Sequence, residues 1–457
     1  MSHHRFPAGA ELSIKADKAS VPMGRTVRVE AILSPDALDA ASDVILLPFV
    51  NQRRWGPHER PDADGRALFL LPLPNPGPAQ VQVLALPSDG DDWMGPAARR
   101  DLLLAGRPRP TGDVGLGSNV LNLEVDRRSF PEREAGETLF CMQWEPWFCT
   151  GVAHWRTAQA VPLTGFYDAF NRDVLLQQML WMIDLGVDFI MPDWSNHIWG
   201  CEHWHERGER ANGILHCTQM ALEVLAEMRD EGLPVPRVAL MSGLSNGPPA
   251  TMGALNEQLD WIYHSYVRTP RFEGLWQEME GKPLIVVLDT GAVAHPQGTA
   301  ASAFRIPFFK QTLGLSESEL DAFRDAQGPV DDTHFTVRWM SSQNQTTGHH
   351  RLGYWSWMDG VVEPPVTYRD GAPEVVTVTP AFFNALGWTG PRAYGRRGGA
   401  TYLDTFKVAL EHRPRVVQLH QFNEFTGQRE GHGYGPDHAI YVDTYSVELS
   451  DDIEPVS

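Results

Sequence analysis

The stretch Arg415–Phe425, RVVQLHQFNEF, decides how the second half of this chain is interpreted. Its first half is an apolar run typical of a buried strand. Its second half turns abruptly into polar side chains around the carboxyl group of Glu424. In a (β/α) barrel the functional groups stand at the carboxyl ends of the strands. The stretch therefore predicts a barrel strand that ends in a functional site.

Seven similar runs precede this one, and helical patterns separate several of them. The eight expected strands are Thr138–Glu145, Asp188–Trp194, Arg237–Leu244, Pro283–Thr290, Phe335–Ser342, Arg351–Asp359, Glu374–Ala381 and Arg415–Phe425. The connections DVLLQQMLWMIDLG and ILHCTQMALEVLAEMRDEG place apolar residues at helical spacing, and each ends at a Gly. Strands that alternate with helices imply a parallel sheet with right-handed crossovers. Eight of them favour an α/β fold of the closed (β/α)₈ type, the TIM barrel. The alternative is an open doubly wound sheet, whose Gly-rich phosphate fingerprint is missing after the first strand.

Residues 1–135 follow a different pattern. Short strand-like runs such as TVRVEAIL and AQVQVLALP are separated by Pro, Gly and Asp turns, and no convincing helix lies between them. This spacing is typical of an Ig-like β-sandwich. We therefore predict an N-terminal β-sandwich accessory domain over 1–135 and a barrel catalytic domain over 136–457.

The composition is that of an ordinary globular protein, with 457 residues, 42% hydrophobic and 21% charged. Subtracting 58 acidic from 38 basic residues gives −20, a balance that argues against nucleic acid as a partner. The sequence contains no run of about 18 apolar residues, so a membrane span is not expected. The first residues lack a basic-then-apolar leader, so we expect either a cytoplasmic protein or an exported one whose leader has been removed. Oligomeric state is left open.

Carboxylates, amides, imidazoles and Trp gather at the ends of the predicted strands, a mixture that suits carbohydrate. Glycosidic cleavage usually needs two carboxyl groups, one of which must keep its proton near neutral pH. We expect Glu424, flanked by Phe422 and Phe425, to be the general acid and Asp193 to be the nucleophile or base. Glu145 could replace either of them. A carboxylate at a strand end can also merely cap a helix or pair with an Arg.

A further set of side chains at the same strand ends is expected to orient the sugar. Trp147 and Trp199 are the best candidates for stacking platforms because they fall in polar loops, whereas Trp elsewhere more often serves packing. The substrate-binding candidates are Trp144, Trp147, Trp194, Asn196, His197, Trp199, Asp289, Trp357, Asp359, His420, Gln421 and Asn423.

The loop HIWGCEHWHERGE invites a metal interpretation. His203 and His205, with Cys201 and Glu202, could ligate Zn²⁺ or a late transition metal. However, this spacing matches no closed-site pattern, and the first strand offers Trp and Glu where metal-dependent barrel hydrolases typically carry a His-x-His pair. We therefore expect neither metal nor cofactor, and histidines that contact sugar or support the residues that do.

Three motifs resemble the glycoside hydrolase family 71/99/WbsX-like group: WEPWF after the first strand, GVDFIMPDWSN at the second, and QFNEFTGQ with YVDTYSVELSDDIEP at the end. The resemblance implies a TIM barrel that acts on glycosides or polysaccharide. It supports a functional role for Asn423 and Glu424 and, less firmly, for Asp193 and Asn196. Family 99 endomannosidases carry two Glu in a His-x-x-Glu-type loop that has no clear equivalent here, which leaves the sugar, the linkage and the stereochemistry open.

The expected function is therefore that of a glycosidase, a hydrolase that cleaves an oligo- or polysaccharide. Two alternatives remain: a non-catalytic carbohydrate-binding barrel, and a metal-dependent hydrolase that uses the loop of residues 197–205.

Overall fold

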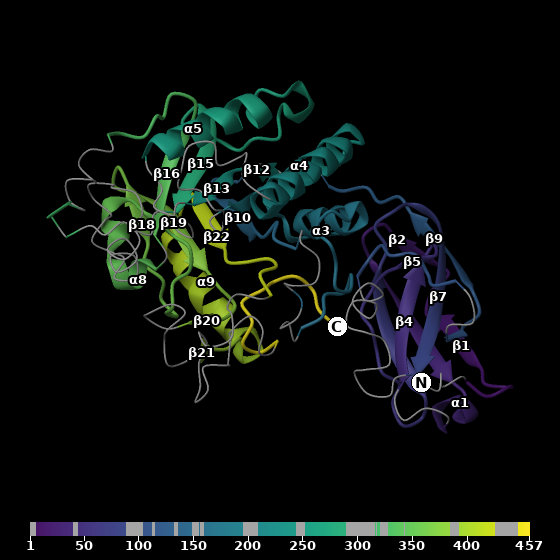
Figure 1. Ribbon diagram of the computed structural model, residues 1–457. Coiled ribbons are helices and arrows are strands. Elements are labelled where there is room, and N and C mark those ends of the chain that lie inside the picture. Colours follow the sequence, from purple (N-terminus) through teal and green to yellow (C-terminus); the bar gives the residue numbers. More distant parts are fainter. Residues whose placement is uncertain are drawn as a thin grey trace.

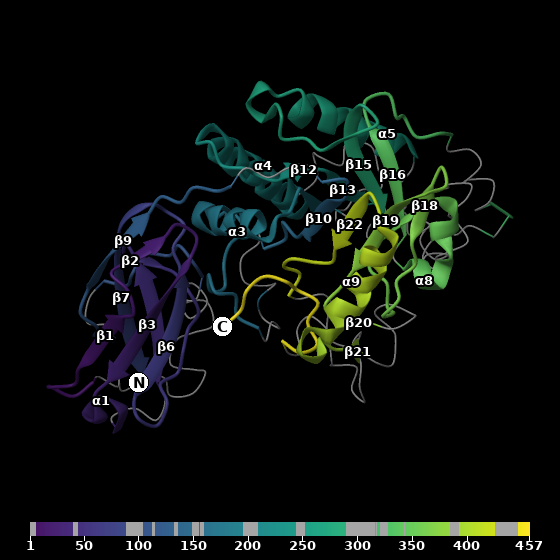
Figure 2. The ribbon, with the colours of Figure 1, turned by 180° about the vertical axis from the view of Figure 1, so that it is seen from behind.

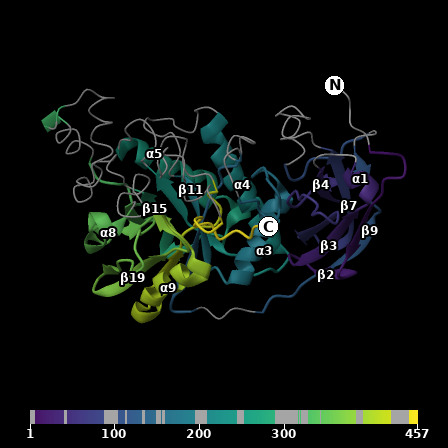
Figure 3. The ribbon, with the colours of Figure 1, turned by 90° about the horizontal axis from the view of Figure 1, so that it is seen from below.

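The computed structural model of the chain describes a set of ranges with gaps between them. These are residues 6–39, 44–87, 104–111, 115–131, 136–148, 155, 160–194, 209–243, 252–288, 316, 318–319, 328–341, 343–383, 393–425 and 447–457. Two bodies are visible, a group of N-terminal sheets and a larger barrel, and the C-terminus lies between them (Figures 1 and 3).

The N-terminal region is built from two sheets. The first is antiparallel, in the order β1 (Leu12–Ala16), β3 (Thr26–Leu33), β6 (Arg66–Pro72). The second runs β2 (Ser20–Pro22), β9 (Leu121–Asp126), β7 (Gly77–Pro87), β4 (Val44–Val50), β5 (Arg53–Arg54), with β8 (Leu116–Gly117) beside β7; α1 (Pro35–Asp39) is a short helix. Alternate residues of β3, such as Val27 and Val29, are buried, as a half-buried strand requires. Buried residues of both sheets join one hydrophobic cluster.

All eight predicted barrel strands are present. They are β10 (Leu139–Trp144), β11 (Phe189–Trp194), β12 (Arg237–Val238) with β13 (Leu240–Gly243), β15 (Lys282–Leu288), β16 (Thr336–Ser341), β17 (Trp355–Ser356), β19 (Ala372–Val378) and β22 (Val416–Leu419). Neighbours pair in parallel in the order β17-β16-β15-β13-β11-β10-β22-β19. This order follows the chain around a ring, and the alternative of an open doubly wound sheet is not found.

The ring is nearly closed between β17 and β19. No strand ladder joins them in the described residues, but the Thr377 hydroxyl donates to the Ser356 carbonyl at 2.7 Å, and the Gln418 amide reaches the same oxygen at 2.7 Å. β17 has only two residues, whereas the sequence predicted a strand over Arg351–Asp359. A 3₁₀ turn, η6 (His349–Leu352), occupies the first part of that range and ends at Gly353, whose φ is 84°.

Helices cover the outside of the barrel (Figures 1 and 2). They are α3 (Arg172–Leu185), α4 (Glu209–Asp230), α5 (Met252–Ile262) with its π-helical extension η3 (Tyr263–Val267), α8 (Asn344–Thr347) and α9 (Ala400–His412). The smaller elements are η4 (Pro270–Phe272), β14 (Glu278–Met279), β18 (Thr367–Arg369), β20 (Phe382–Phe383), β21 (Ala393–Tyr394) and η8 (Arg397–Gly399). The Asn171 side chain caps α3 by accepting from Asp173 N, and Gly186 ends the helix in the left-handed conformation, as the sequence predicts. Among the described residues, no helix is both long and apolar enough to cross a membrane.

The strand period decides which side chains face the barrel interior. On β10, Cys141 belongs to the interior cluster, whereas Met142 and Trp144 belong to the cluster that also contains helix residues such as Leu180. Side chains alternate between the two faces of a strand. The same alternation therefore directs Gln143 and then Glu145 inward.

The N-terminal sheets and the barrel contact each other through specific pairs. The Gln177 amide of α3 donates to the Gly24 carbonyl at 3.0 Å, and Asp184 pairs with both Arg25 and Arg128. The division of the chain at residue 135 stays a prediction.

Candidate active site

The three carboxyl groups predicted for catalysis are all buried. Asp193 belongs to β11, Glu145 directly follows β10, and Glu424 follows β22, so each stands at the carboxyl end of its strand. The exposed fractions are 0% for Glu145, 0% for Asp193 and 2% for Glu424. These strands are consecutive neighbours around the barrel. The structure thus brings the first, second and eighth strand ends together at one mouth.

Glu145 lies among several other carboxyl groups. Burial raises the pKa of its carboxyl group well above the usual range, and Asp193, Glu424 and Asp452 raise it further. Its oxygens accept no hydrogen bond from an N–H or O–H group in the described residues. Asp193 acts on Glu145 both through its charge and through a side-chain interaction, and two carboxyl groups in such surroundings oppose each other's ionisation.

The surroundings of Glu424 also favour the protonated form of its carboxyl group. Burial raises the pKa of this carboxyl well above its usual range, and Asp451, Asp452 and Asp193 add to the effect. The Gln421 amide donates to Glu424 Oε2 and opposes the rise, because it favours the charged form. A carboxylic acid that keeps its proton near neutral pH can act as a proton donor.

The C-terminal segment supplies acids that the sequence analysis did not assign to the site. Ile453 N donates to the Gln421 carbonyl at 2.9 Å and Glu454 N donates to the Phe422 carbonyl at 2.8 Å, so the segment lies along the chain that follows β22. Asp451, Asp452 and Glu454 are all buried. An acidic run near a chain end is usually solvated. The one sequence signal that pointed to these acids was the motif SDDIEP, which was quoted only as part of the resemblance to a glycoside hydrolase family.

Asp452 holds the backbone on which Glu424 stands. Its carboxylate accepts the backbone N–H of Glu424 and, at 3.0 Å, that of Phe425, while the Ser450 hydroxyl donates to it at 2.8 Å. Burial, together with Asp451, raises the pKa of Asp452 to about 8 despite these hydrogen bonds. Asp452 is thus a positioning residue for the proposed acid.

Asn423 holds Glu145 in place. Its side-chain oxygen accepts from Glu145 N at 2.8 Å, and its amide donates to the Glu145 carbonyl at 3.2 Å and to the Tyr167 hydroxyl at 2.9 Å. Tyr167 in turn donates to Glu454 at 2.9 Å. The predicted role of Asn423 was to bind substrate, whereas these contacts make it a link between the first and eighth strand ends.

Asn423→Ala is expected to lower the free energy of unfolding by about 2–5 kcal/mol, because it leaves the buried backbone N–H and carbonyl of Glu145 without partners and removes a donor to the Tyr167 hydroxyl. Urea denaturation monitored by circular dichroism measures this loss. Asn256→Ala, at a half-buried hydrogen-bonded Asn on α5, serves as the control and is expected to cost clearly less. Equal losses in the two variants would contradict the link.

Four further predicted residues lie inside the barrel. His420 pairs through Nε2 with Asp451 at 2.9 Å and through Nδ1 with Gln143, and the Trp357 ring stands edge-on to it with centroids 4.5 Å apart. Gln421 contacts Glu424 as described. Asp359 accepts from the Ser356 hydroxyl at 2.9 Å, and burial raises its pKa to about 7. Asp359 therefore follows the sixth strand as a buried acid.

Two predicted Trp residues face the helix layer instead. Trp144 donates to Gln178 at 3.0 Å and Trp194 donates to Thr218 at 2.8 Å, and their exposed fractions are 1% and 0%. Trp147, expected to be open in a polar loop, is 8% exposed and donates to the Asp193 carbonyl at 3.1 Å. The strand period directs Trp144 and Trp194 away from the interior. None of the three presents an open ring face, and we omit Trp144 and Trp194 from the proposed site.

Several candidates lie outside the described residues. They are Asn196, His197, Trp199 and Asp289, together with Cys201, Glu202, His203 and His205 of the alternative metal site. Their roles stay predictions.

The buried acids predict how stability depends on pH. The pKa values of Asp452 and Glu454 are both raised to about 8, against about 4 in an unfolded chain. Between these values the folded state binds more protons, so the free energy of unfolding should fall as pH rises from about 5 to about 8, by roughly 1.4 kcal/mol per unit for each fully titrating group. Denaturation at pH 5, 6.5 and 8 tests this. In Glu454→Gln part of the slope should disappear; stability that rises across this range would refute the assignment.

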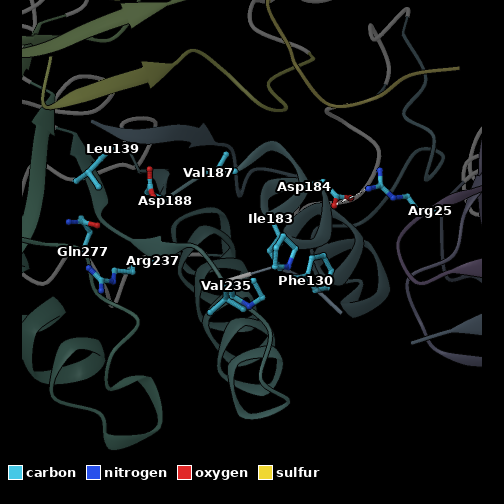
Figure 4. Close-up of a pocket in the computed structure, with 13 residues that line it drawn as sticks. Arg25, Phe130, Leu139, Ile183, Asp184, Val187, Asp188, Val235, Arg237 and Gln277 are labelled. Carbon is cyan, nitrogen blue, oxygen red and sulfur yellow. Dashed lines mark hydrogen bonds and ion pairs between the residues drawn. The ribbon is translucent and has the colours of Figure 1, made fainter. Parts of the chain in front are cut away.

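A separate cavity of about 660 Å³ lies at the other end of the barrel strands (Figure 4). Its lining includes Leu139 at the start of β10, Asp188 just before β11 and Arg237 at the start of β12. The amino ends of barrel strands usually serve stability rather than catalysis. We therefore do not assign this cavity to the site.

The structure is a parallel barrel with a group of buried carboxyl groups at the carboxyl ends of its strands. Within this group, neighbouring carboxyl groups raise the pKa of Glu145 and of Glu424. No family model and no curated protein matches the chain. Among solved structures it is similar to an endo-alpha-mannosidase of family GH99 from Bacteroides thetaiotaomicron, with 15% identity, a TM-score of 0.42 and coverage of 70% of this chain and 88% of that one. A protein described as glycoside hydrolase-like has 12% identity, a TM-score of 0.33 and coverage of 65% and 87%. Identities this low do not assign the chain to a family, and the function proposed below rests on the site.

Proposed function

We propose that this protein is a glycoside hydrolase that cleaves a glycosidic bond in an oligo- or polysaccharide. The observation that carries the proposal is the coupled group of Glu145, Asp193 and Glu424 at neighbouring strand ends, in surroundings that raise the pKa of Glu145 and Glu424. Glycosidic cleavage requires one carboxyl group that holds a proton and a second that can act as a base or nucleophile. A group of acids in different environments can supply both the protonated and the ionised carboxyl group.

In this proposal Glu424 donates a proton to the oxygen of the leaving sugar. The Glu145–Asp193 pair shares one proton, and its ionised member either attacks the anomeric carbon or activates a water molecule. Asp193 is our choice for this role, because burial and the surrounding carboxyl groups raise the pKa of Glu145 and so favour the protonated form of that member. Both a retaining and an inverting course are compatible with these roles.

The remaining parts of the proposal concern substrate contacts and domains. His420, Gln421, Trp357 and Asp359 would orient the sugar or the acids that act on it, and Asn196, His197, Trp199 and Asp289 remain proposed contacts. We further propose that the two N-terminal sheets form a β-sandwich domain over residues 1–135. Such a module would either bind carbohydrate or brace the barrel.

A screen of polysaccharides and aryl glycosides for released reducing sugar tests the proposal. The same panel should be measured for binding, because the rival function is a barrel that binds carbohydrate without cleaving it. Shorter products that accumulate with time support a hydrolase. Tight binding of a ligand that stays intact after long incubation would support the rival.

A further inference from the structure

Three potential metal ligands meet on the outside of the barrel, away from the carboxyl groups of the mouth. Asp260 and His264 come from α5 and its extension η3, and His334 comes from the segment just before β16. One ligand atom from each lies within 4.8 Å of the others. Asp260 Oδ1 and His264 Nε2 are 3.3 Å apart. No other such group of His, Cys, Asp or Glu occurs in the described part of the chain.

The spacing of the first two ligands suits a metal ion. Asp260 and His264 are four residues apart on a helix, so their side chains lie on the same face. With metal–ligand bonds of about 2.0–2.1 Å, two ligands of a tetrahedral zinc ion are separated by about 3.3 Å. The pair therefore already has the separation of a tetrahedral edge, and the third ligand needs to move by about 1.5 Å at most.

The third ligand is held in place by its surroundings. The His334 ring lies flat on Tyr263, with centroids 3.8 Å apart and an interplanar angle of 3°. The segment that carries His334 is tied to α5 by Asn256, which accepts from Asp331 N at 2.8 Å and donates to the Pro329 carbonyl at 3.3 Å. These contacts fix the ligand arrangement through bonds that need no ion. Binding would therefore require little ordering of the chain.

The donor set and its charge indicate the kind of ion. Two imidazole nitrogens and one carboxylate oxygen suit zinc and late first-row metals, whereas magnesium and calcium prefer oxygen ligands alone. A second carboxyl group, that of Asp331, lies near His334, and the imidazole contributes to lowering the pKa of Asp331. The side chains of His264 and Asp260 are 50% and 65% exposed, which leaves room for water as further ligands.

We propose that Asp260, His264 and His334 bind one zinc-class ion that joins the end of α5 to the entrance of β16. His334 precedes the amino end of β16, whereas the carboxyl groups of the mouth lie at the carboxyl ends of the strands. The ion thus stabilises the outer layer and takes no part in bond cleavage. The alternative for Asp260 and His264 is a surface ion pair, which is weak and does not involve His334.

Zinc binding to the full chain tests the proposal. After removal of metal with a chelator, zinc is titrated by calorimetry into the wild type, His264→Ala, His334→Ala and the control His412→Ala, an exposed His at the end of α9. Because 17 His are present in the chain, the informative quantity is the difference between variants. We expect wild type and control to share one site that each of the other two variants weakens by more than about 100-fold, since even partners of metal ligands contribute about 10–100-fold.

Thermal unfolding gives a second readout. Zinc should raise the Tm of the wild type and of His412→Ala, and should leave the Tm of His264→Ala unchanged. Without zinc, His264→Ala and His412→Ala should melt close to the wild type, whereas His334→Ala should melt somewhat lower because it also loses its stacking on Tyr263. Equal stoichiometry and affinity in all variants, or no binding to the wild type at micromolar zinc, would overturn the proposal.

Discussion

Glu424→Gln is expected to lower kcat by about 10²–10⁴-fold, the usual contribution of a general acid, while the protein stays folded. Gln has the same shape and can still accept from Gln421, but it has no acidic proton to donate. It also removes a buried group whose ionisation is opposed by Asp451 and Asp452. The free energy of unfolding at pH 8 should therefore equal or exceed that of the wild type.

The measurement is the initial rate on the best substrate of the panel, together with urea denaturation. Glu411→Gln, at an exposed Glu on α9, is the matched control and should retain wild-type kinetics. The alkaline limb of the wild-type pH profile should be lost in Glu424→Gln, because the group that must hold a proton is gone. A variant with full activity would remove Glu424 from the mechanism.

Asp452→Ala is expected to impair both stability and catalysis. Backbone N–H groups of Glu424 and Phe425 lose their acceptor, as does the Ser450 hydroxyl, at a cost of about 2–4 kcal/mol in the free energy of unfolding. Displacing Glu424 by about 1 Å is enough to lower kcat by about 10²-fold.

Asp452→Asn provides the contrast for this prediction. Its side-chain oxygen can still accept one of the backbone N–H groups, so its loss of stability and its fall in kcat should both be smaller than those of the Ala variant. If the role of Asp452 were purely structural, the two variants would lower the free energy of unfolding but leave kcat of the folded fraction unaltered. That outcome would exclude Asp452 as a positioning residue.

The barrel was predictable because its strands are buried on both faces. Such strands read as continuous apolar runs, and eight of them separated by helical patterns leave few alternatives. The length of the sixth strand was overestimated. Its predicted range contains Trp355 and Trp357, which suit a strand, but the sequence does not reveal that the preceding residues form a 3₁₀ turn.

The site was predictable in part. The strand-end rule predicted that Glu145, Asp193 and Glu424 lie at one mouth, and the order of the strands places them at neighbouring strand ends; their catalytic roles stay predictions. The same rule included Trp144 and Trp194, although each adjoins an inward-facing acid and must point to the other face. Strict use of the alternation would have excluded both.

The contribution of the C-terminal segment was not predictable from local pattern. Asp452 and Glu454 belong to an acidic stretch that, taken alone, is typical of a solvated tail. Glu454 accepts hydrogen bonds from Tyr167 and Gln178, and Asp452 accepts from the backbone of Glu424 and Phe425, so both acids pair with residues far away in the sequence. Long-range pairing of this kind leaves no periodic trace in the sequence.

The most direct test of the proposed function compares wild type and Glu424→Gln on the same carbohydrate panel, with reducing sugar measured over time and binding measured in parallel. The account predicts that at least one oligo- or polysaccharide is shortened by the wild type, and that the variant binds it with similar affinity but leaves it intact. Hydrolysis at equal rates by both proteins, or binding without any hydrolysis by the wild type, would contradict it.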